Sequence, residues 1–210
     1  RHSGPGYFRR FLDNEMSEAG SPLVPARFEF SFGMEPDRTD DPNSSPAPVD
    51  LDAPDGSAKL RIRGRIDRID ISPTGAFLIY DYKSGSQHPK AKDIEAGTAL
   101  QLPLYLQAFG QITGMQGIGG GYYTIRREVA RSIVLADPSV KDLMILRIRP
   151  STDFSGLVSH ARECAFTCAQ GIREGRFPLP AGEECLNPYC AFRRICRFDP
   201  FRIFPSGEGT

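Results

Sequence analysis

The sequence lacks a long apolar run: none approaches the roughly 18 residues needed to cross a bilayer. The first residues, RHSG, do not resemble a signal peptide, and no Walker A pattern or internal repeat is present. These absences exclude a membrane-spanning helix, and they place any ATP hydrolysis in another part or partner. Because no initiator methionine is present, we interpret the chain as a fragment of a larger polypeptide.

The chain also lacks net charge, with 26 basic and 26 acidic residues among its 210. Taken alone, this balance argues against a strongly nucleic-acid-binding domain. Residues 35–57, however, hold seven acidic side chains, one arginine and five prolines, which predicts an acidic flexible insertion of net charge −6. The other 187 residues therefore carry +6, so the body of the domain is mildly basic.

Hydrophobic periodicity indicates an α/β domain. A turn at 72–75 joins two strands into a hairpin, and the second strand is apolar on both faces, which is typical of a central strand. We predict a mixed central β-sheet flanked by helices, followed by a small cysteine-rich C-terminal tail. The predicted helices are 5–17, 92–109 and 154–175, and the predicted strands are 27–32, 58–71, 76–83, 117–126 and 143–149. Because Pro103 lies inside the second helical pattern, an alternative start for this helix is near Leu100, with Pro103 in its first turn.

The strand predicted at 58–71 changes its apolar parity after Asp67. A bulge or bend beside Asp67 would produce this change, and bulges are common next to active sites. Asp81 and Lys83 share a face of the following strand, and the hairpin can bring Asp67 beside Asp81. Two carboxylates at a strand end form an oxygen-ligand site that suits Mg²⁺ or Mn²⁺. An adjacent lysine suits metal-assisted hydrolysis. Taken alone, however, a D-x-K pattern is more often a strand-end ion pair, and only the motifs around it shift this balance.

Three linked motifs, GRIDRID (64–70), DYKSG (81–85) and QLPLY (101–105), resemble the RecB-like branch of the PD-(D/E)xK nuclease superfamily. The resemblance covers about residues 26–199 and implies the restriction-endonuclease-like fold. It also implies that Asp67, Asp81 and the backbone carbonyl of Tyr82 bind Mg²⁺ or Mn²⁺. By the same resemblance, Lys83 is the catalytic lysine, and Gln101 and Tyr105 position the phosphate or the lysine.

This branch usually has a further metal ligand on an upstream helix, which we leave unassigned and expect before Arg1. Glu29 is expected to face solvent, because it lies in a strand of alternating aromatics that places Phe28, Phe30 and Phe32 on one face.

The tail cysteines Cys185, Cys190 and Cys196 resemble the iron–sulfur staple of AddB-type nucleases, which holds a [4Fe–4S] cluster with a fourth, distant cysteine. Clustered thiolates suit iron–sulfur or zinc in a reducing compartment. We therefore divide the chain into a nuclease core, 1–180, and a staple, 181–204. Cys164 and Cys168 lie four residues apart in a predicted helix and are interpreted as buried core thiols.

Basic and aromatic side chains near the predicted site suit phosphates and unstacked bases. The members of this group are Arg61, Arg63, Arg65, Arg68, Arg126, Arg127, Arg193, Arg194, Arg197, Tyr122, Tyr123, Phe192 and Phe198.

The resemblance implies a metal-dependent DNA nuclease, the exonuclease part of a helicase–nuclease complex that repairs double-strand breaks in the bacterial cytoplasm. Its partners would be DNA and a helicase region or subunit, without a membrane. Two alternatives stay open: a nuclease-fold module that grips DNA without cleaving it, and a stand-alone exonuclease of CRISPR adaptation. The intact Asp67, Asp81 and Lys83 argue against the first alternative.

Overall fold

The structure is a computed structural model that describes residues 6–85, 87–125, 129–145 and 148–177. The chain divides into two compact units, residues 1–169 and 170–210. Everything below on the sheet and the site concerns the first unit. The predicted boundary at residue 180 lies outside the described residues.

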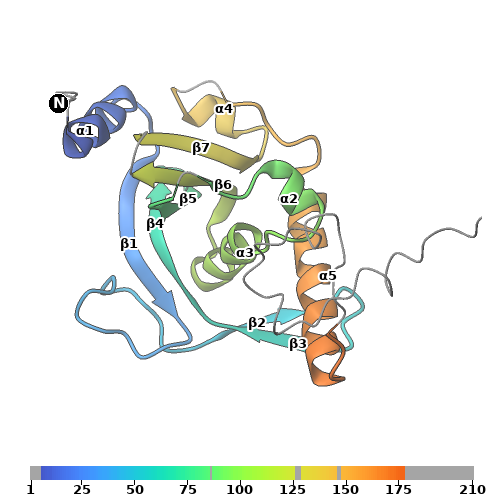
Figure 1. Cartoon of the computed structure of the whole chain (residues 1–210). Coiled ribbons are helices and arrows are strands. Elements are labelled where there is room, and N and C mark those ends of the chain that lie inside the picture. Colours follow the sequence, from blue (N-terminus) through green and yellow to red (C-terminus); the bar gives the residue numbers. More distant parts are fainter. Residues whose placement is uncertain (1–5, 86, 126–128, 146–147, 178–210) are drawn as a thin grey trace, which may run out of the picture. The chain divides into compact units, whose positions relative to one another are not determined.

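The first unit is built on a five-stranded mixed sheet with the order β1-β4-β5-β6-β7 (Figure 1). All neighbouring strands are antiparallel except β5 and β6, which are parallel. The predicted mixed sheet is thereby confirmed, and so is the predicted hairpin of 58–71 and 76–83, which is β4 paired with β5. The strands are β1 (Val24–Phe32), β4 (Gly64–Ile71), β5 (Ala76–Lys83), β6 (Gln116–Ile125) and β7 (Val129–Ala136), and a separate small sheet pairs β2 (Val49–Asp52) with β3 (Lys59–Ile62).

Helices lie on both faces of the sheet (Figure 1). The helix α3 packs its apolar residues Leu102, Leu106 and Phe109 into the larger core cluster, and α1 lies along β7 on the other side. None of the described helices is long and apolar enough to span a membrane. The helices are α1 (Tyr7–Ser17), α2 (Ala91–Glu95), α3 (Gln101–Thr113), α4 (Val140–Leu143) and α5 (Phe154–Arg173).

The central strand β5 separates two apolar clusters, as its continuous apolar sequence predicts. Phe77 and Ile79 point into the cluster beneath α3, whereas Leu78 and Tyr80 point into the cluster on the opposite face. Each of these four side chains is at most 1% exposed. The strand end that follows, at Asp81 and Lys83, is therefore held by packing on both sides.

Several predicted elements were wrong in detail. The described residues of the range 143–149, which are 143–145 and 148–149, do not form a strand, and the missed strand is β7, at 129–136. The apolar pattern over 92–109 belongs to two helices, α2 and α3, and α3 begins at Gln101 with Pro103 in its first turn, as the position of that proline predicted. The predicted strand 58–71 is interrupted at Arg63 to give β3 and β4. The acidic segment 35–57 is not a loop throughout, because it contains β2.

The strand β1 departs from simple alternation at Glu29. This residue has a φ of 51°, the left-handed region, and Phe28 before it is 49% exposed while Phe30 and Phe32 are buried. The prediction that the three phenylalanines share a face was therefore wrong for Phe28. A residue with positive φ changes the direction of the strand, so the side chains before and after it do not follow one alternation.

Candidate active site

Asp67 lies where β4 changes its apolar face. Ile66 and Ile69, three residues apart, both enter the core beneath α3, which confirms the parity change around Asp67. The ladder between β1 and β4 keeps one register from Arg27 to Phe32, so the predicted bulge is not a register shift. Instead, the Asp67 carboxylate accepts a hydrogen bond from the backbone N–H of Tyr82, with 2.7 Å between the Tyr82 nitrogen and Asp67 Oδ2. This bond fixes Asp67 beside the end of β5.

Asp81 and Lys83 lie at the end of β5 and point toward the α3 face, the same face as Phe77 and Ile79. Asp81 is 7% exposed, and Lys83 Nζ lies 2.5 Å from its Oδ2. The predicted pairing of these two side chains with Asp67 at one strand end agrees with the structure.

Gln101 begins α3, and its Nε2 donates a 2.7 Å hydrogen bond to Asp81 Oδ1. The resemblance implied contact with the phosphate or the lysine, but in the structure Gln101 contacts the carboxylate. The amide therefore orients Asp81, while Lys83 takes the other oxygen of the same carboxylate. The exposed position of Gln101 is that of a helix surface residue, but its side chain is engaged.

Tyr105 lies one turn further along α3 and packs against β1 and β4. Its ring is 5.8 Å from that of Phe32, edge to face. A side chain at Gly64 would place its Cβ 2.6 Å from the Tyr105 ring. The close approach of this ring therefore explains the glycine of GRIDRID. A role of Tyr105 in positioning phosphate or lysine stays a prediction.

The site gathers negative charge in a partly buried place. Burial raises the pKa of Asp67, and the charge of Asp81 raises it further, although the Tyr82 N–H and Lys83 act in the opposite direction. Glu29 lies opposite Asp67 in the β1–β4 ladder, between the pairs Phe28–Arg68 and Phe30–Ile66. Burial and then the charge of Asp67 raise the pKa of Glu29 too. Glu29 is half-buried, so the expectation that it faces solvent was wrong.

A divalent cation fits the chemistry of these residues. Asp81 Oδ2 is buried and accepts no hydrogen bond of good geometry, although Lys83 Nζ is close enough for an ion pair. A buried carboxylate oxygen in this state suits a cation, which needs oxygen ligands and not directed donors. Among the described residues, no three side chains of His, Cys, Asp or Glu converge, so Asp67 and Asp81 form a two-carboxylate site.

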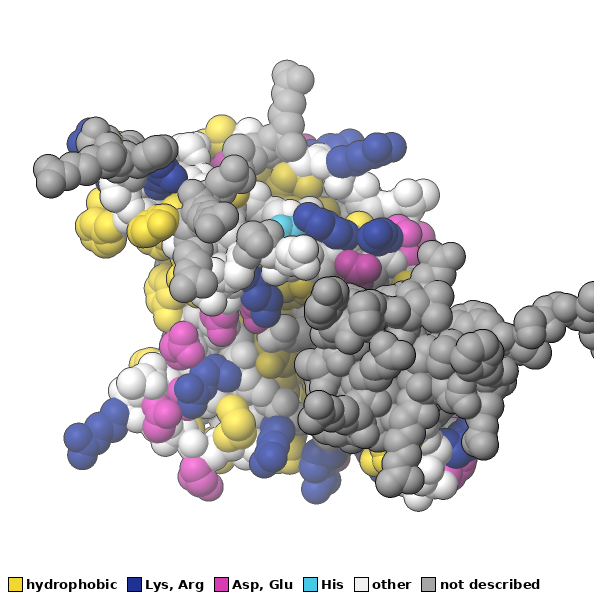
Figure 2. Space-filling model, in the orientation of Figure 1, with side chains coloured by type: hydrophobic (Ala, Val, Ile, Leu, Met, Phe, Trp, Pro, Cys, Tyr) yellow, Lys and Arg dark blue, Asp and Glu magenta, His cyan; other side chains and the backbone are white. Residues whose placement is uncertain are grey.

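The arginines of the predicted basic group are mostly paired where the structure describes them. Arg61 binds Asp50 at 2.9 Å, and Arg65 binds Asp40 at 2.9 Å. Arg68 is 2% exposed, so it does not face DNA, and Figure 2 shows acidic and basic side chains intermixed on the visible face. Tyr122 and Tyr123 are at most 2% exposed, so the prediction that they stack on bases was wrong. Arg126, Arg127, Arg193, Arg194, Arg197, Phe192 and Phe198 lie outside the described residues.

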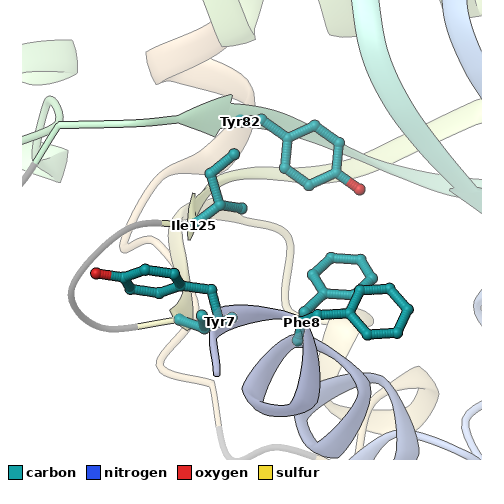
Figure 3. Close-up of a pocket in the computed structure, with 6 residues that line it drawn as sticks. Tyr7, Phe8, Tyr82 and Ile125 are labelled. Atoms are coloured by element: carbon teal, nitrogen blue, oxygen red, sulfur yellow. The ribbon is translucent and has the colours of Figure 1, made fainter. Parts of the chain in front are cut away.

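The opposite face of the same strand end is apolar. The Tyr82 ring, between Asp81 and Lys83 in sequence, lines a pocket of about 370 Å³ together with Tyr7 and Phe8 of α1 (Figure 3). Tyr82 therefore contacts both faces of the sheet, because its backbone N–H binds Asp67 while its ring packs toward α1.

The tail cysteines Cys185, Cys190 and Cys196 lie outside the described residues, so the predicted staple stays a prediction. In α5, Cys168 is exposed and Cys164 is half-buried, and both are free thiols. The interpretation of this pair as buried core thiols was wrong for Cys168.

Comparison with known proteins decides the family. The family model described as "PD-(D/E)XK nuclease superfamily" matches residues 1–197. The chain belongs to the PD-(D/E)XK nuclease superfamily. Its mixed sheet and flanking helices agree with the restriction-endonuclease-like fold of this superfamily, as the three motifs predicted.

Curated relatives within the superfamily are each named as a subunit of an "ATP-dependent helicase/deoxyribonuclease". The protein of Symbiobacterium thermophilum is 29% identical over 87% of this chain, and that of Pelotomaculum thermopropionicum is 29% identical over 85%. That of Clostridium acetobutylicum is 27% identical over 88%. The chain spans about a fifth of the length of these relatives. The crystal structure of SSO0001 matches 71% of this chain at 19% identity with a TM-score of 0.33.

Two contacts of the site were not predicted from the sequence, since Tyr122 was expected to stack on bases and His88 was not considered. The ring of Tyr122 lies beneath Lys83, and His88 stacks on the same ring. The contact of Tyr122 with Lys83 follows from the register of β5 against β6, and His88 lies outside both strands. Glu29 had a weak signal, because its strand pairs with the one that carries Asp67.

Proposed function

We propose that this chain is the nuclease part of a DNA helicase–nuclease and hydrolyses phosphodiester bonds with a divalent cation, Mg²⁺ or Mn²⁺. The observation that carries the proposal is the convergence of Asp67, Asp81, Lys83 and Gln101 at the end of β5. The names of the relatives support DNA as the substrate and a helicase region or subunit as the partner. Such an enzyme would act in the bacterial cytoplasm, as an exonuclease in double-strand break repair.

Each residue has a distinct part in the proposed reaction. Asp67 and Asp81 would hold the cation, with the Tyr82 carbonyl as a further oxygen ligand. In such a site a bound cation supplies activation of water and neutralisation of charge on the leaving oxygen. The Tyr82 N–H keeps the Asp67 carboxylate in place, and the Gln101 amide does the same for Asp81. Lys83 brings positive charge to the phosphate, where negative charge grows in the transition state.

Cleavage of linear DNA by the purified chain, with and without Mg²⁺ or Mn²⁺, tests the proposal. Asp81→Asn and Lys83→Met should abolish cleavage, because each removes a ligand or a charge from the transition state. The matched controls are Asp52→Asn and Lys59→Met, since these two side chains are exposed and pair with each other at 3.6 Å. Equal cleavage by all four variants would overturn the assignment.

Metal binding gives a second measurement that does not require activity. Calorimetric titration with Mn²⁺ should show weaker binding to Asp67→Asn and Asp81→Asn. Lys83→Met should bind Mn²⁺ at least as tightly as the parent chain, because Lys83 competes with the cation for Asp81 Oδ2. Loss of Mn²⁺ binding in Lys83→Met would contradict the division of roles.

Gln101→Ala should slow cleavage less than Asp81→Asn, since Gln101 orients a ligand and does not itself bind the cation. If both cleavage and Mn²⁺ binding are unchanged, Gln101 has no part in the site and is only a surface residue of the helix.

The same measurements distinguish the main alternative, a module that grips DNA without cleaving it. Such a module would bind DNA but leave it intact at every metal concentration. It would also tolerate Lys83→Met, because a non-catalytic fold does not need this ion pair.

The proposed enzyme also includes an iron–sulfur site at Cys185, Cys190 and Cys196. Three thiolates suit this cofactor chemically, and a brown chain with an absorbance band near ~400 nm would support it. Cys→Ser changes at these positions should remove the band, while Cys168→Ser should retain it. A bound zinc ion without colour would correct the metal only.

A further inference from the structure

Lys83 is held from two sides. Its Nζ pairs with Asp81 and also lies 5.5 Å from the centroid of the Tyr122 ring. We propose that Tyr122 is the positioning residue that aims Lys83 at the phosphate, and that His88 holds the Tyr122 ring in place. The proposal rests on the proposed function and deepens it, because it says how the lysine is fixed.

Tyr122 is placed by the sheet itself. It lies in β6 directly beside Asp81 of β5, in the parallel register that also pairs Lys83 with Thr124. Its side chain belongs to the core cluster beneath α3 and is 2% exposed. A ring fixed in this way provides a rigid surface for a flexible lysine side chain.

His88 packs on the same ring from the segment between β5 and α2. The two ring centroids are 5.1 Å apart and the planes differ by 30°, which is a stacked arrangement. His88 Nδ1 lies 2.9 Å from the carbonyl oxygen of Pro89, so the imidazole is oriented by the backbone next to it. The segment that follows Lys83 is thereby tied back to the site.

The chemistry favours a ring over another carboxylate at this point. A lysine side chain is long and has many rotamers, and an ammonium group is attracted to the face of an aromatic ring. The ring attracts the charge without competing for the hydrogen-bond donors of the ammonium as a second carboxylate would. Of the three N–H donors, those not directed at Asp81 remain for a phosphate oxygen.

Kinetics of the full chain with Mn²⁺ and linear DNA test the proposal through paired variants. Tyr122→Leu should lower kcat roughly 3- to 30-fold with little change in KM, the range expected for loss of one cation–π contact. Tyr122→Phe should keep the parent kcat, because the ring and not the hydroxyl is required. Mn²⁺ affinity should be the same in all three proteins. Equal kcat for Tyr122→Leu and the parent chain, or a loss in Tyr122→Phe as large as in Tyr122→Leu, would overturn the proposal.

An NMR measurement keeps the proposal testable even if Tyr122→Leu does not fold. The chain has only five lysines, so ¹³C-lysine labelling gives few side-chain signals, and Lys83→Arg identifies the one of interest. The Lys83 Hε protons of the parent chain should be shifted upfield by the ring current of Tyr122, and Tyr122→Phe should retain the shift. Lys83 signals at the position of a free lysine in the parent chain would overturn the proposal.

The contribution of His88 is tested by a matched pair. His88→Phe keeps a ring that can stack, so it should retain the upfield shift of Lys83 and the parent kcat. His88→Ala should reduce both, and equal values in the two variants would remove His88 from the proposal. Failure of the proposed function itself is distinguishable, since then the parent chain and Lys83→Met would be equally inactive or equally active.

Discussion

The two faces of the sheet at β4 and β5 use charge in opposite ways. On the face beneath α3, Asp67 and Asp81 are close together with one lysine, and Asp81 Oδ2 lacks a directed hydrogen bond. On the face that meets α1, Arg68 binds Asp70 through two hydrogen bonds of 2.6 and 2.8 Å. The motif GRIDRID contributes to both arrangements, with Asp67 to the incomplete one and with Arg68 and Asp70 to the complete one.

The complete arrangement extends across the sheet to α1. Arg68 also binds Glu15 at 2.8 Å, and Arg131 of β7 binds the same Glu15 oxygen at 2.8 Å. Burial raises the pKa of Glu15, but the two arginines outweigh it, so its pKa is lowered. The guanidinium carbons of Arg68 and Arg131 lie 5.4 Å from the rings of Tyr80 and Tyr123 respectively. Charges that are paired with one another in this way support the fold, whereas the carboxylates beneath α3 are free to bind a cation and substrate.

Replacing one carboxylate on each face gives the largest expected contrast. Asp81→Asn should reduce cleavage by several orders of magnitude, because loss of a metal ligand costs several kcal/mol at the transition state. Its free energy of unfolding should change little, since the loss of the ion pair with Lys83 is opposed by the removal of a repulsive neighbour of Asp67. Cleavage rates and urea unfolding of the same preparation check both statements. A strongly destabilised Asp81→Asn protein would contradict the contrast.

The opposite face should show the reverse result. Asp70→Ala leaves the buried Arg68 without its bidentate partner, which should lower the free energy of unfolding by about 3–5 kcal/mol. Asp50→Ala is the matched control, because its bidentate pair with Arg61 is on the surface and should contribute little. Urea unfolding at one pH compares them. Equal losses would show that burial of the Arg68–Asp70 pair does not matter.

The sequence predicted the incomplete face better than the complete one. The site residues beneath α3 lie in short sequence motifs, and these motifs can be recognised without knowing how the strands pair. They are Asp67, Asp81, Lys83 and Gln101. The partners of Arg68 depend on α1 and β7, and β7 was missed because Arg131 stands at an inward position of its alternating pattern. An arginine at an inward position of a sequence pattern suggests a solvated segment. Arg131 can occupy this position because its charge is paired with Glu15.

The false strand at 143–149 has a related cause. A short apolar run does not by itself distinguish a strand from other buried or surface segments. In the structure Ile145 is 56% exposed, and β7 already occupies the edge of the sheet beside β6. The contact of Tyr122 with Lys83 was unpredictable for a third reason, since it requires the parallel register of β5 and β6.

A smaller effect is expected on the pH dependence of the free energy of unfolding, through Asp67 on the face beneath α3. The pKa of Asp67 is raised in the folded chain, so the folded state binds its proton more tightly than the unfolded state does. Stability from this group is present below its ordinary pKa, near 3.8, and is lost as the pH rises through the raised value. Asp67→Asn should therefore be more stable than the parent chain at pH 7 but not at pH 3.5.

The asparagine in this variant can still accept the Tyr82 N–H through its amide oxygen, so the comparison isolates the charge. Unfolding by urea at the two pH values without added metal measures the difference. A variant that is less stable at pH 7 by the same amount as at pH 3.5 would show that the Asp67 charge is fully compensated in the folded chain.

The smallest expected effect concerns the backbone at Glu29, where β1 turns opposite Asp67. Its φ of 51° is costly for a residue with a Cβ, by about 1–2 kcal/mol relative to an ordinary strand conformation. Glu29→Gly and Glu29→Ala both remove the carboxylate, but only glycine adopts this φ without strain. Glu29→Gly should therefore be more stable than Glu29→Ala by about 1 kcal/mol in urea unfolding, after an allowance for the greater freedom of glycine in the unfolded chain. The opposite order would mean that the strand relaxes when the carboxylate is lost, and that the charge opposite Asp67 is what holds β1 in its turned form.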